Sequence, residues 1–143
     1  MAPVHYIIDG VDIPDWLFEA MFCEANKAFI ETKAIQEFTN AHILPLVRET
    51  LHIPELMACS NHVHIGTDGL EPHDHLPHAF TSVLYVTDAE GAIVLEPCDA
   101  AIRIKPCEGR LVIFGATVVH SVDPSHGELR AALVTNYEYP SVP

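Results

Sequence analysis

The segment "GRLVIFGATVVHSV", residues 109–122, holds two short apolar runs separated by Gly115. Both runs are rich in β-branched residues, which favour strands, and a glycine between two such runs is typical of a turn. The segment therefore predicts a strand, a turn and a second strand. The second strand brings one histidine, His120, to its end.

Five further segments share this pattern. They are short, rich in β-branched residues and bounded by Gly, Pro, Asp or Asn: residues 57–66, 79–88, 91–96, 101–106 and 129–139. Several short strands at such close spacing are typical of a sandwich, a barrel or a jelly roll. The chain shows neither βαβ alternation nor internal repeats, so we expect a mostly β fold.

The first 55 residues have a different pattern, which predicts helices at 15–31 and 33–51. Pro14 and Asp15 suit the first turn of the earlier helix. Three- and four-residue spacing gives this helix one apolar, core-facing stripe: Leu17, Phe18, Met21, Phe22, Ala25, Ala28 and Phe29. The later helix carries a similar set on one side: Ile35, Phe38, Ala41 and His42. Pro45 is expected to kink or end it.

Length and composition predict a single domain. The chain has 143 residues, 49% of them hydrophobic, which suits one domain over 1–143 with helical support in 1–55 and a β-core in 56–143. Seven basic residues against twenty acidic ones give a formal net charge of −13. Nucleic acids and anionic membranes attract basic surfaces, so this charge argues against both as partners.

The N-terminus and the cysteines predict a cytoplasmic location. "MAPVHYIIDG" lacks the basic head and long apolar stretch of a signal peptide, and no apolar run approaches the ~18 residues of a membrane span. The four cysteines contain no CxxC pair: Cys23, Cys59, Cys98 and Cys107. Reduced thiols are therefore expected, and nothing in the pattern supports a Cys98–Cys107 bridge.

Residues 71–78, "EPHDHLPH", contain three of the ten histidines. Alternate side chains of a strand face the same side, so His73 and His75 can both point inward at a strand's end, with Asp74 turned away. Two ligands leave a metal underbound, and His120 is a good candidate for the third. An isolated His-x-His pair in a proline-rich loop is more often solvent-exposed. The combination with His120 and Arg130 favours a metal site.

Arg130 opens the apolar segment 129–139, in an otherwise acidic protein. A guanidinium among apolar residues needs a partner, and its fork matches a carboxylate bidentately. That carboxylate could belong to a small ligand or to one of the many acidic side chains.

Residues 60–139 resemble the Fe(II)/2-oxoglutarate oxygenases, in particular the prolyl-4-hydroxylase-like members. "PHDHLPHAFTSVLYVTD" is similar to the stretch in which the first metal ligands precede a strand. "IKPCEGRLVIFGATVVHSVDPSHGELRAALVTNY" matches the family's second block at five positions: Pro106, Gly109, Phe114, His120 and Arg130. The resemblance implies a double-stranded β-helix, or jelly roll, with the two N-terminal helices packed on it.

The resemblance also implies cofactors and a reaction. Fe(II) would be bound by His73, His75 and His120, and the far carboxylate of 2-oxoglutarate would pair with Arg130. The implied reaction is hydroxylation of a C–H bond of a peptidyl or small-molecule substrate, with ascorbate as an accessory reductant.

The cofactor pocket has three further candidate residues. His64 lies near the point where the family often has a tyrosine that contacts the co-substrate, and Tyr85 and Leu70 are further pocket candidates. Each is otherwise an ordinary strand residue. A chain of 143 residues has little room for substrate-binding loops. A partner, or the second subunit of a homodimer, would then complete the substrate site.

Two departures from the family keep other readings open. The usual His-x-Asp or His-x-Glu motif has His75 in the acid's place, and "GAIVLE" at 91–96 stands where the family often has Gly-Gly-Glu-Thr. Three-histidine iron also resembles cupin-type thiol dioxygenases, but no glutamate follows His75 at the cupin spacing, and His120 lies eleven residues beyond Gly109. The third reading is a non-catalytic jelly-roll binding module with a vestigial or zinc-filled site.

Overall fold

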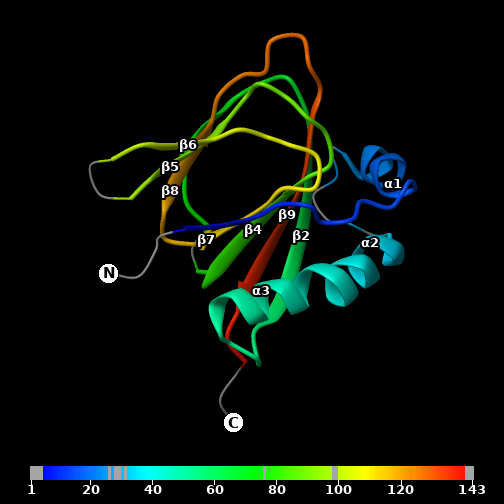
Figure 1. Cartoon of the computed structure of the whole chain (residues 1–143), viewed down its shortest axis with the longest axis vertical. Coiled ribbons are helices and arrows are strands. Elements are labelled where there is room, and N and C mark those ends of the chain that lie inside the picture. The colour runs from blue at the N-terminus through cyan, green and yellow to red at the C-terminus, as the bar shows by residue number, and fades with distance from the viewer. Residues whose placement is uncertain are drawn as a thin grey trace.

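Two antiparallel sheets form the body of the protein (Figure 1). The computed structural model describes residues 5–25, 27, 30, 32–75, 77–97 and 100–140. The five-stranded sheet has the order β1 (His5–Ile8), β7 (Leu111–Gly115), β4 (Phe80–Tyr85), β9 (Arg130–Glu138) and β2 (Met57–Gly66). The four-stranded sheet has the order β3 (Leu70–His73), β8 (Val119–Val122), β5 (Ile93–Glu96) and β6 (Ile102–Ile104).

One apolar core lies between the two sheets. It joins inward side chains of β4, β7 and β9 to those of β5 and β6: Val83, Tyr85, Ile93, Leu95, Ile104, Val112, Phe114, Ala132 and Val134. Inward and outward side chains alternate along each strand, as the pleat requires. This arrangement confirms the predicted mostly β, jelly-roll fold.

A second core lies between the helices and the outer face of the five-stranded sheet. On β9, Ala131, Leu133 and Tyr137 face the helices while Ala132 and Val134 face the other sheet. Because both faces of β9 are covered, the strand reads as a nearly continuous apolar run. The core therefore holds β9, which begins at Arg130, in one register.

The helical part consists of α1 (Leu17–Glu24), α2 (Lys33–Phe38), a π-helical turn (Thr39–Ile43) and α3 (Leu44–Leu51). The last three follow one another without a break, so the helix predicted at 33–51 is present and does not end at Pro45. Proline has no backbone N–H to donate to the carbonyl four residues earlier. The wider π-helical turn just before Pro45 accommodates this missing hydrogen bond, so the helix continues. No helix in the described part of the chain is long and apolar enough to span a membrane.

Three details of the N-terminal prediction need correction. The first helix ends at Glu24 rather than at residue 31, and its predicted stripe residues Ala28 and Phe29 lie outside the described residues. Phe22 is 61% exposed and does not belong to the buried face. Residues 1–55 are not purely helical, because β1 (His5–Ile8) pairs with β7 as the edge strand of the large sheet.

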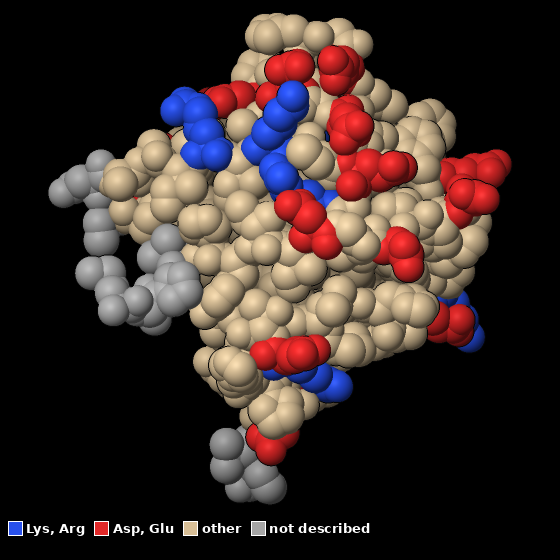
Figure 2. All heavy atoms as spheres, viewed as in Figure 1, with Lys and Arg blue, Asp and Glu red and all other residues tan. Residues whose placement is uncertain are grey.

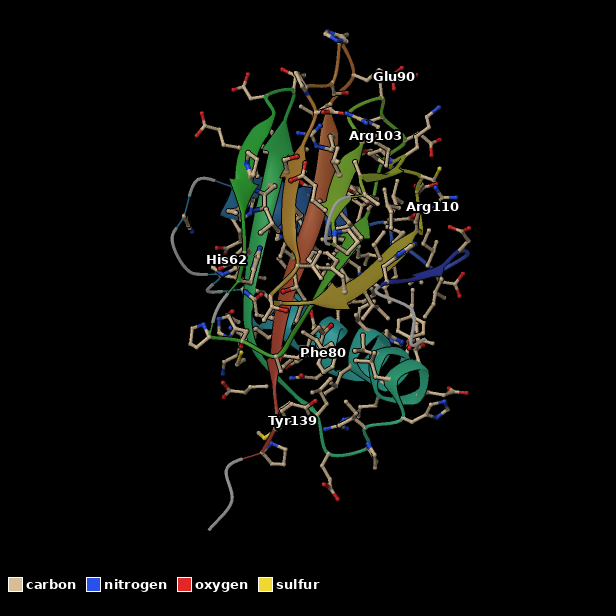
Figure 3. All side chains as sticks on the ribbon, turned by 90° about the vertical axis from the view of Figure 1, so that its left-hand side faces the viewer. His62, Phe80, Glu90, Arg103, Arg110 and Tyr139 are labelled. Atoms are coloured by element: carbon tan, nitrogen blue, oxygen red, sulfur yellow. The ribbon has the colours of Figure 1, made fainter. Side chains whose placement is uncertain are left out.

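Acidic side chains predominate on the face shown in Figure 2, with a few basic ones among them. Two arginines are paired with acids: Arg110 Nε lies 2.8 Å from Asp9 Oδ1, and Arg103 Nε lies 3.2 Å from Asp123 Oδ2. Such exposed pairs contribute at most about 1 kcal/mol each. In Figure 3, Arg103 and Arg110 lie on the opposite side of the molecule from His62 of β2.

Candidate metal centre

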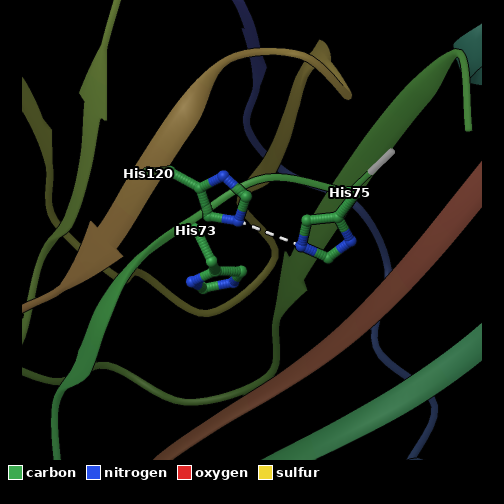
Figure 4. A group of neighbouring side chains, drawn as sticks. All are labelled: His73, His75 and His120. Atoms are coloured by element: carbon green, nitrogen blue, oxygen red, sulfur yellow. Dashed lines mark hydrogen bonds between the residues drawn. The ribbon is translucent and has the colours of Figure 1, made fainter. Parts of the chain in front are cut away.

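Three imidazoles meet where β3 and β8 lie side by side (Figure 4). His73 is the last residue of β3 and pairs directly with His120 of β8. His75 lies beyond the end of β3 and is held by a backbone hydrogen bond of 2.9 Å from its N–H to the carbonyl of Ala116. One potential ligand atom from each ring lies within 4.8 Å of those of the other two. The predicted clustering of these three side chains is therefore present, although His75 is not itself in a strand.

Each of the three rings uses its Nδ1 in a hydrogen bond to an oxygen that can only accept. The acceptors are the Glu71 carbonyl for His73 at 2.8 Å, the Asn136 side-chain oxygen for His75 at 2.8 Å, and the Val118 carbonyl for His120 at 3.0 Å. The proton of each neutral ring must therefore sit on Nδ1. This leaves the lone pair of each Nε2 available, as in metal-binding histidines whose second nitrogen donates to a neighbour.

The Nε2 atoms of His75 and His120 lie 3.0 Å apart. Two nitrogens at about 2.1 Å from one metal ion, at a right angle, would lie about 3.0 Å apart. Burial lowers the pKa of His120 to about 4, and the neighbouring imidazoles act in the same direction. Burial likewise lowers the pKa of His75. Both rings are therefore neutral near pH 7, which is the form that binds metal, and the three residues fit a divalent ion.

Asn136 of β9 orients His75 and was not among the predicted site residues. Its side chain is 2% exposed. The amide oxygen also accepts a hydrogen bond of 2.9 Å from Thr81 Oγ1, while Nδ2 donates to Ser60 Oγ at 3.2 Å. These bonds hold the amide in place, with its oxygen facing His75. A period-2 count from Arg130 along the segment could have identified Asn136, because residues 130, 132, 134 and 136 share one face of the strand.

Arg130 is 7% exposed at the start of β9. Its Nη1 donates to the carbonyls of Asp123 at 2.9 Å and Gly91 at 3.3 Å, and its Nη2 donates to the carbonyl of Asp68. Among the described residues, no carboxylate lies within ion-pair distance of its guanidinium. A buried charge without a counter-ion is costly. Asp123 and Asp68 act on the pKa of Arg130 from a longer distance, and the guanidinium lies in the wall of a cavity that could admit a ligand carboxylate.

Gly91 makes room for this arginine. A Cβ at position 91 would lie 2.0 Å from Arg130 Nη1 and 2.4 Å from the Asp123 carbonyl oxygen. Any side chain here would displace the guanidinium. The stretch 91–96 departs from the family's usual turn, yet its glycine has a clear steric role.

A cavity of about 560 Å³ extends from the three imidazoles to Arg130. Tyr85 and Leu70, both predicted as pocket residues, line it together with His64. His62 lies opposite Val134 of β9, and His64 lies opposite Ala132. Opposed residues of two paired strands share one face of the sheet, and Ala132 and Val134 face the other sheet, so the two histidines also lie on the inner face. His64 as a whole residue is exposed, and its ring lies at the wall of the cavity.

The polar residues of this cavity are mostly neutral or cationic. Burial lowers the pKa of His64, and the nearby His73, His75 and Arg130 add to this effect. Burial raises the pKa of the Tyr85 hydroxyl, so this group stays protonated and can donate a hydrogen bond. Asp74 is exposed and does not belong to the group of three histidines, although its carboxylate acts on the pKa of His120.

The described cysteines carry no disulfide. Cys23, Cys59 and Cys107 are free thiols, and Cys98 lies outside the described residues. No described cysteine belongs to the three-histidine group.

Comparisons with known proteins identify the fold. No protein-family model and no curated protein sequence matches the chain. Among solved structures, a Pseudomonas putida prolyl-4-hydroxylase matches with a TM-score of 0.69 and 16% identity, over 96% of this chain and 94% of that one. The non-heme alpha-ketoglutarate-dependent epimerase SnoN from nogalamycin biosynthesis matches with a TM-score of 0.78 and 14% identity, over 95% and 78%.

An oxidoreductase of the 2OG-Fe(II) oxygenase family from Burkholderia pseudomallei gives a more partial match. Its TM-score is 0.64 at 15% identity, over 73% of this chain and 55% of that protein, so the chain spans about half the length of this neighbour. At these identities the likeness establishes the fold. The chain thus has the fold of the Fe(II)/2-oxoglutarate oxygenases, and the predicted resemblance to this superfamily and its prolyl-4-hydroxylase-like members is confirmed at the level of structure.

Proposed function

We propose that the protein is an Fe(II)/2-oxoglutarate-dependent oxygenase. The observation that carries this proposal is the content of one cavity: three imidazoles at one end, and at the other a buried guanidinium that has no carboxylate within ion-pair distance among the described residues. A metal and a dicarboxylate together would satisfy both ends. The solved structure of SnoN with Fe3+ and alpha-ketoglutarate has the same fold and supports this pairing of ligands.

In this proposal each residue has a defined role. His73, His75 and His120 hold the iron, and Arg130 pairs with the far carboxylate of 2-oxoglutarate. Tyr85, whose hydroxyl stays protonated, is placed to donate a hydrogen bond within the same cavity. When bound, iron and 2-oxoglutarate supply the oxidation of a substrate C–H bond by dioxygen.

The apolar part of the cavity wall limits access of water. Val83, Ile93, Val122, Ala132 and Val134 all line the cavity. Exclusion of bulk water protects a reactive site from side reactions and strengthens the electrostatic interactions inside it. The substrate itself is proposed only by class, as a peptidyl group or a small molecule that enters through the mouth beside His64.

The third histidine changes the charge of the centre. With His75 in place of a carboxylate, all three protein ligands are neutral. They do not reduce the +2 charge of the ion, so only its other ligands can offset that charge. Asn136, which orients His75, is also neutral. We therefore expect the centre to bind anionic chelators such as 2-oxoglutarate firmly, because no carboxylate of the described residues belongs to the ligand group and competes for the ion's charge.

The direct test is succinate formation from 2-oxoglutarate with Fe(II) and ascorbate, measured with and without a peptide library. We expect turnover by the wild-type protein, loss of turnover in His120→Ala with loss of iron, and loss in Arg130→Ala with iron retained. If both variants consume 2-oxoglutarate at the wild-type rate, the proposal is wrong.

A three-histidine cupin-type dioxygenase is the second candidate, because no carboxylate belongs to the ligand group. The two functions differ in the molecule that binds the metal. Under anaerobic conditions, 2-oxoglutarate should change the visible spectrum of the Fe(II) protein if the main proposal is right. A spectral response to small thiols, without a response to 2-oxoglutarate, would favour the cupin-type reaction. No response to either would favour a binding module.

A further inference from the structure

A second group of potential metal ligands lies at the far end of β2 and β9. It consists of Cys59 of β2, His78 in the loop before β4, and Glu138, the last residue of β9. None of these residues lines the cavity described above. The three side chains come from segments that are distant in sequence, so the tertiary structure alone brings them together.

A β-bulge places the cysteine. The register between β2 and β9 shifts between Ala58 and Ser60, so Cys59 is the extra residue without a partner in the ladder. Bulges re-aim side chains and often lie near functional sites. Here the thiol points toward the loop, where Cys59 Sγ lies 3.3 Å from Nδ1 of His78.

The sulfur–nitrogen distance is close to the one expected around a tetrahedral ion. One ligand atom from each of the three residues lies within 4.8 Å of the other two. If Cys59 Sγ and His78 Nδ1 both bound a tetrahedral zinc ion, with bonds of about 2.3 Å and 2.1 Å, the sulfur and the nitrogen would lie about 3.6 Å apart. In the structure they lie 3.3 Å apart. Cys59 and Glu138 are exposed and His78 is half-buried, which leaves the fourth position open to water.

We propose that Cys59, His78 and Glu138 form a second metal site that binds Zn2+. Thiolate and imidazole are the donors that zinc prefers, and a carboxylate completes many such sites. A divalent ion would also offset the repulsion between a thiolate and the neighbouring carboxylate. This site differs from the three-histidine centre in having sulfur among its donors, and it does not depend on the oxygenase proposal.

The second site shares structural supports with the three-histidine centre. The backbone N–H of His78 donates to the carbonyl of His75 at 3.0 Å. The Cys59 thiol donates to the backbone carbonyl of Asn136 at 3.2 Å, and the side chain of Asn136 orients His75. An ion bound by Cys59 and His78 would therefore link β2 to the loop that carries His75, while the thiolate that binds it would give up its hydrogen bond to the Asn136 carbonyl.

Cobalt(II) titration tests this proposal, because a thiolate bound to cobalt gives a near-ultraviolet sulfur-to-metal charge-transfer band. The three-histidine group contains no sulfur and cannot produce it. We expect the band in the wild-type protein, its loss in Cys59→Ser, and its retention in His120→Ala. A matched control replaces Cys23, Cys98 and Cys107 together by serine, leaving Cys59 as the only cysteine, and should keep the band.

Three results would overturn the proposal. The first is absence of the band in the wild-type protein, and the second is its persistence in Cys59→Ser. The third is its persistence in both His78→Ala and Glu138→Ala, because the thiol would then bind cobalt without the other two residues. Circular dichroism and retained cobalt binding at the three histidines verify that each variant is folded. Zinc analysis after dialysis should give one equivalent less for Cys59→Ser than for the wild type.

Discussion

Nε2 of His75 lies 3.0 Å from Nε2 of His120, and both rings carry their proton on the other nitrogen. Two lone pairs that face each other at this distance repel, and either a shared proton or a metal ion between the two nitrogens removes the repulsion. His73 completes the group from the strand paired with β8. A site arranged in this way makes metal binding and folding stability interdependent.

Fe(II) should stabilise the fold. Binding to the folded state alone adds about 2.7 kcal/mol to the free energy of unfolding when the free ion is at a hundred times its dissociation constant. We expect anaerobic Fe(II) to raise the melting temperature of the wild-type protein and to have little effect on His120→Ala. His126→Ala, which removes an exposed histidine, is the control and should respond like the wild type.

Asn136→Ala should weaken Fe(II) binding while all three histidines remain. Without the amide oxygen, His75 is free to rotate or to change tautomer, and loss of such an outer partner typically costs 10- to 100-fold in metal affinity. Competition with a chelator measures the change. Asn61→Ala is a matched control, since its amide oxygen bonds Thr135 rather than a metal-centre histidine. Equal affinities in both variants would contradict the role of Asn136.

Gly91→Ala should weaken 2-oxoglutarate binding with iron binding retained. The added methyl group would meet Arg130 Nη1 at 2.0 Å, so the guanidinium must move. A charge-assisted hydrogen bond contributes about 1.5–3 kcal/mol, which corresponds to roughly 10- to 100-fold in affinity. Calorimetric titration with 2-oxoglutarate gives the measurement. Gly115→Ala, whose methyl group has no neighbour closer than 3.9 Å, should behave like the wild type.

The metal-free protein should lose stability in mild acid. Burial lowers the pKa of folded His120 to about 4 from its ordinary 6.5. Between these values the unfolded chain binds a proton that the folded protein does not, so the free energy of unfolding falls as the pH drops from 6.5 toward 4 and is constant above this window. Between pH 7 and pH 5 the expected loss from this residue is about 2 kcal/mol.

Urea unfolding at the two pH values measures this loss. His120→Gln should reduce the pH dependence without abolishing it, because burial also lowers the pKa of His75. The exposed His126 supplies the control, since His126→Gln should leave the dependence unchanged. An unaltered pH dependence in His120→Gln would show that His120 is not the buried neutral group inferred here.

The strands of the β-core were predictable because their signals are local. Residues 57–66 coincide with β2, and 129–139 enclose β9. Alternating or continuous β-branched runs bounded by turn residues reflect the burial of one or both faces of a strand. In contrast, β1 gave no such signal. It has four residues at a sheet edge, and its partner β7 lies about a hundred positions away in the chain.

The helical segment shows a similar division. Its extent over 33–51 follows from apolar spacing, and the presence of Pro45 predicted a local disturbance. The form of that disturbance, a π-helical turn over Thr39–Ile43 that lets the helix continue, depends on packing against the large sheet. Ile43 and Leu44 are both buried there, and this burial outweighs the lost backbone hydrogen bond.

The amino-acid sequence by itself determined the residue types at the centre, the placing of His73 and His120 in short strands and the arginine at the start of the last strand, because these follow from period-2 patterning and turn chemistry within short segments. Only the tertiary structure decided which ring nitrogens face one another, that Arg130 lacks an acidic partner among the described residues, and that Asn136 and Gly91 serve the site. The physical reason is that directional hydrogen bonds and steric fit arise between segments that pair across the two sheets, and no local pattern encodes the distance between them.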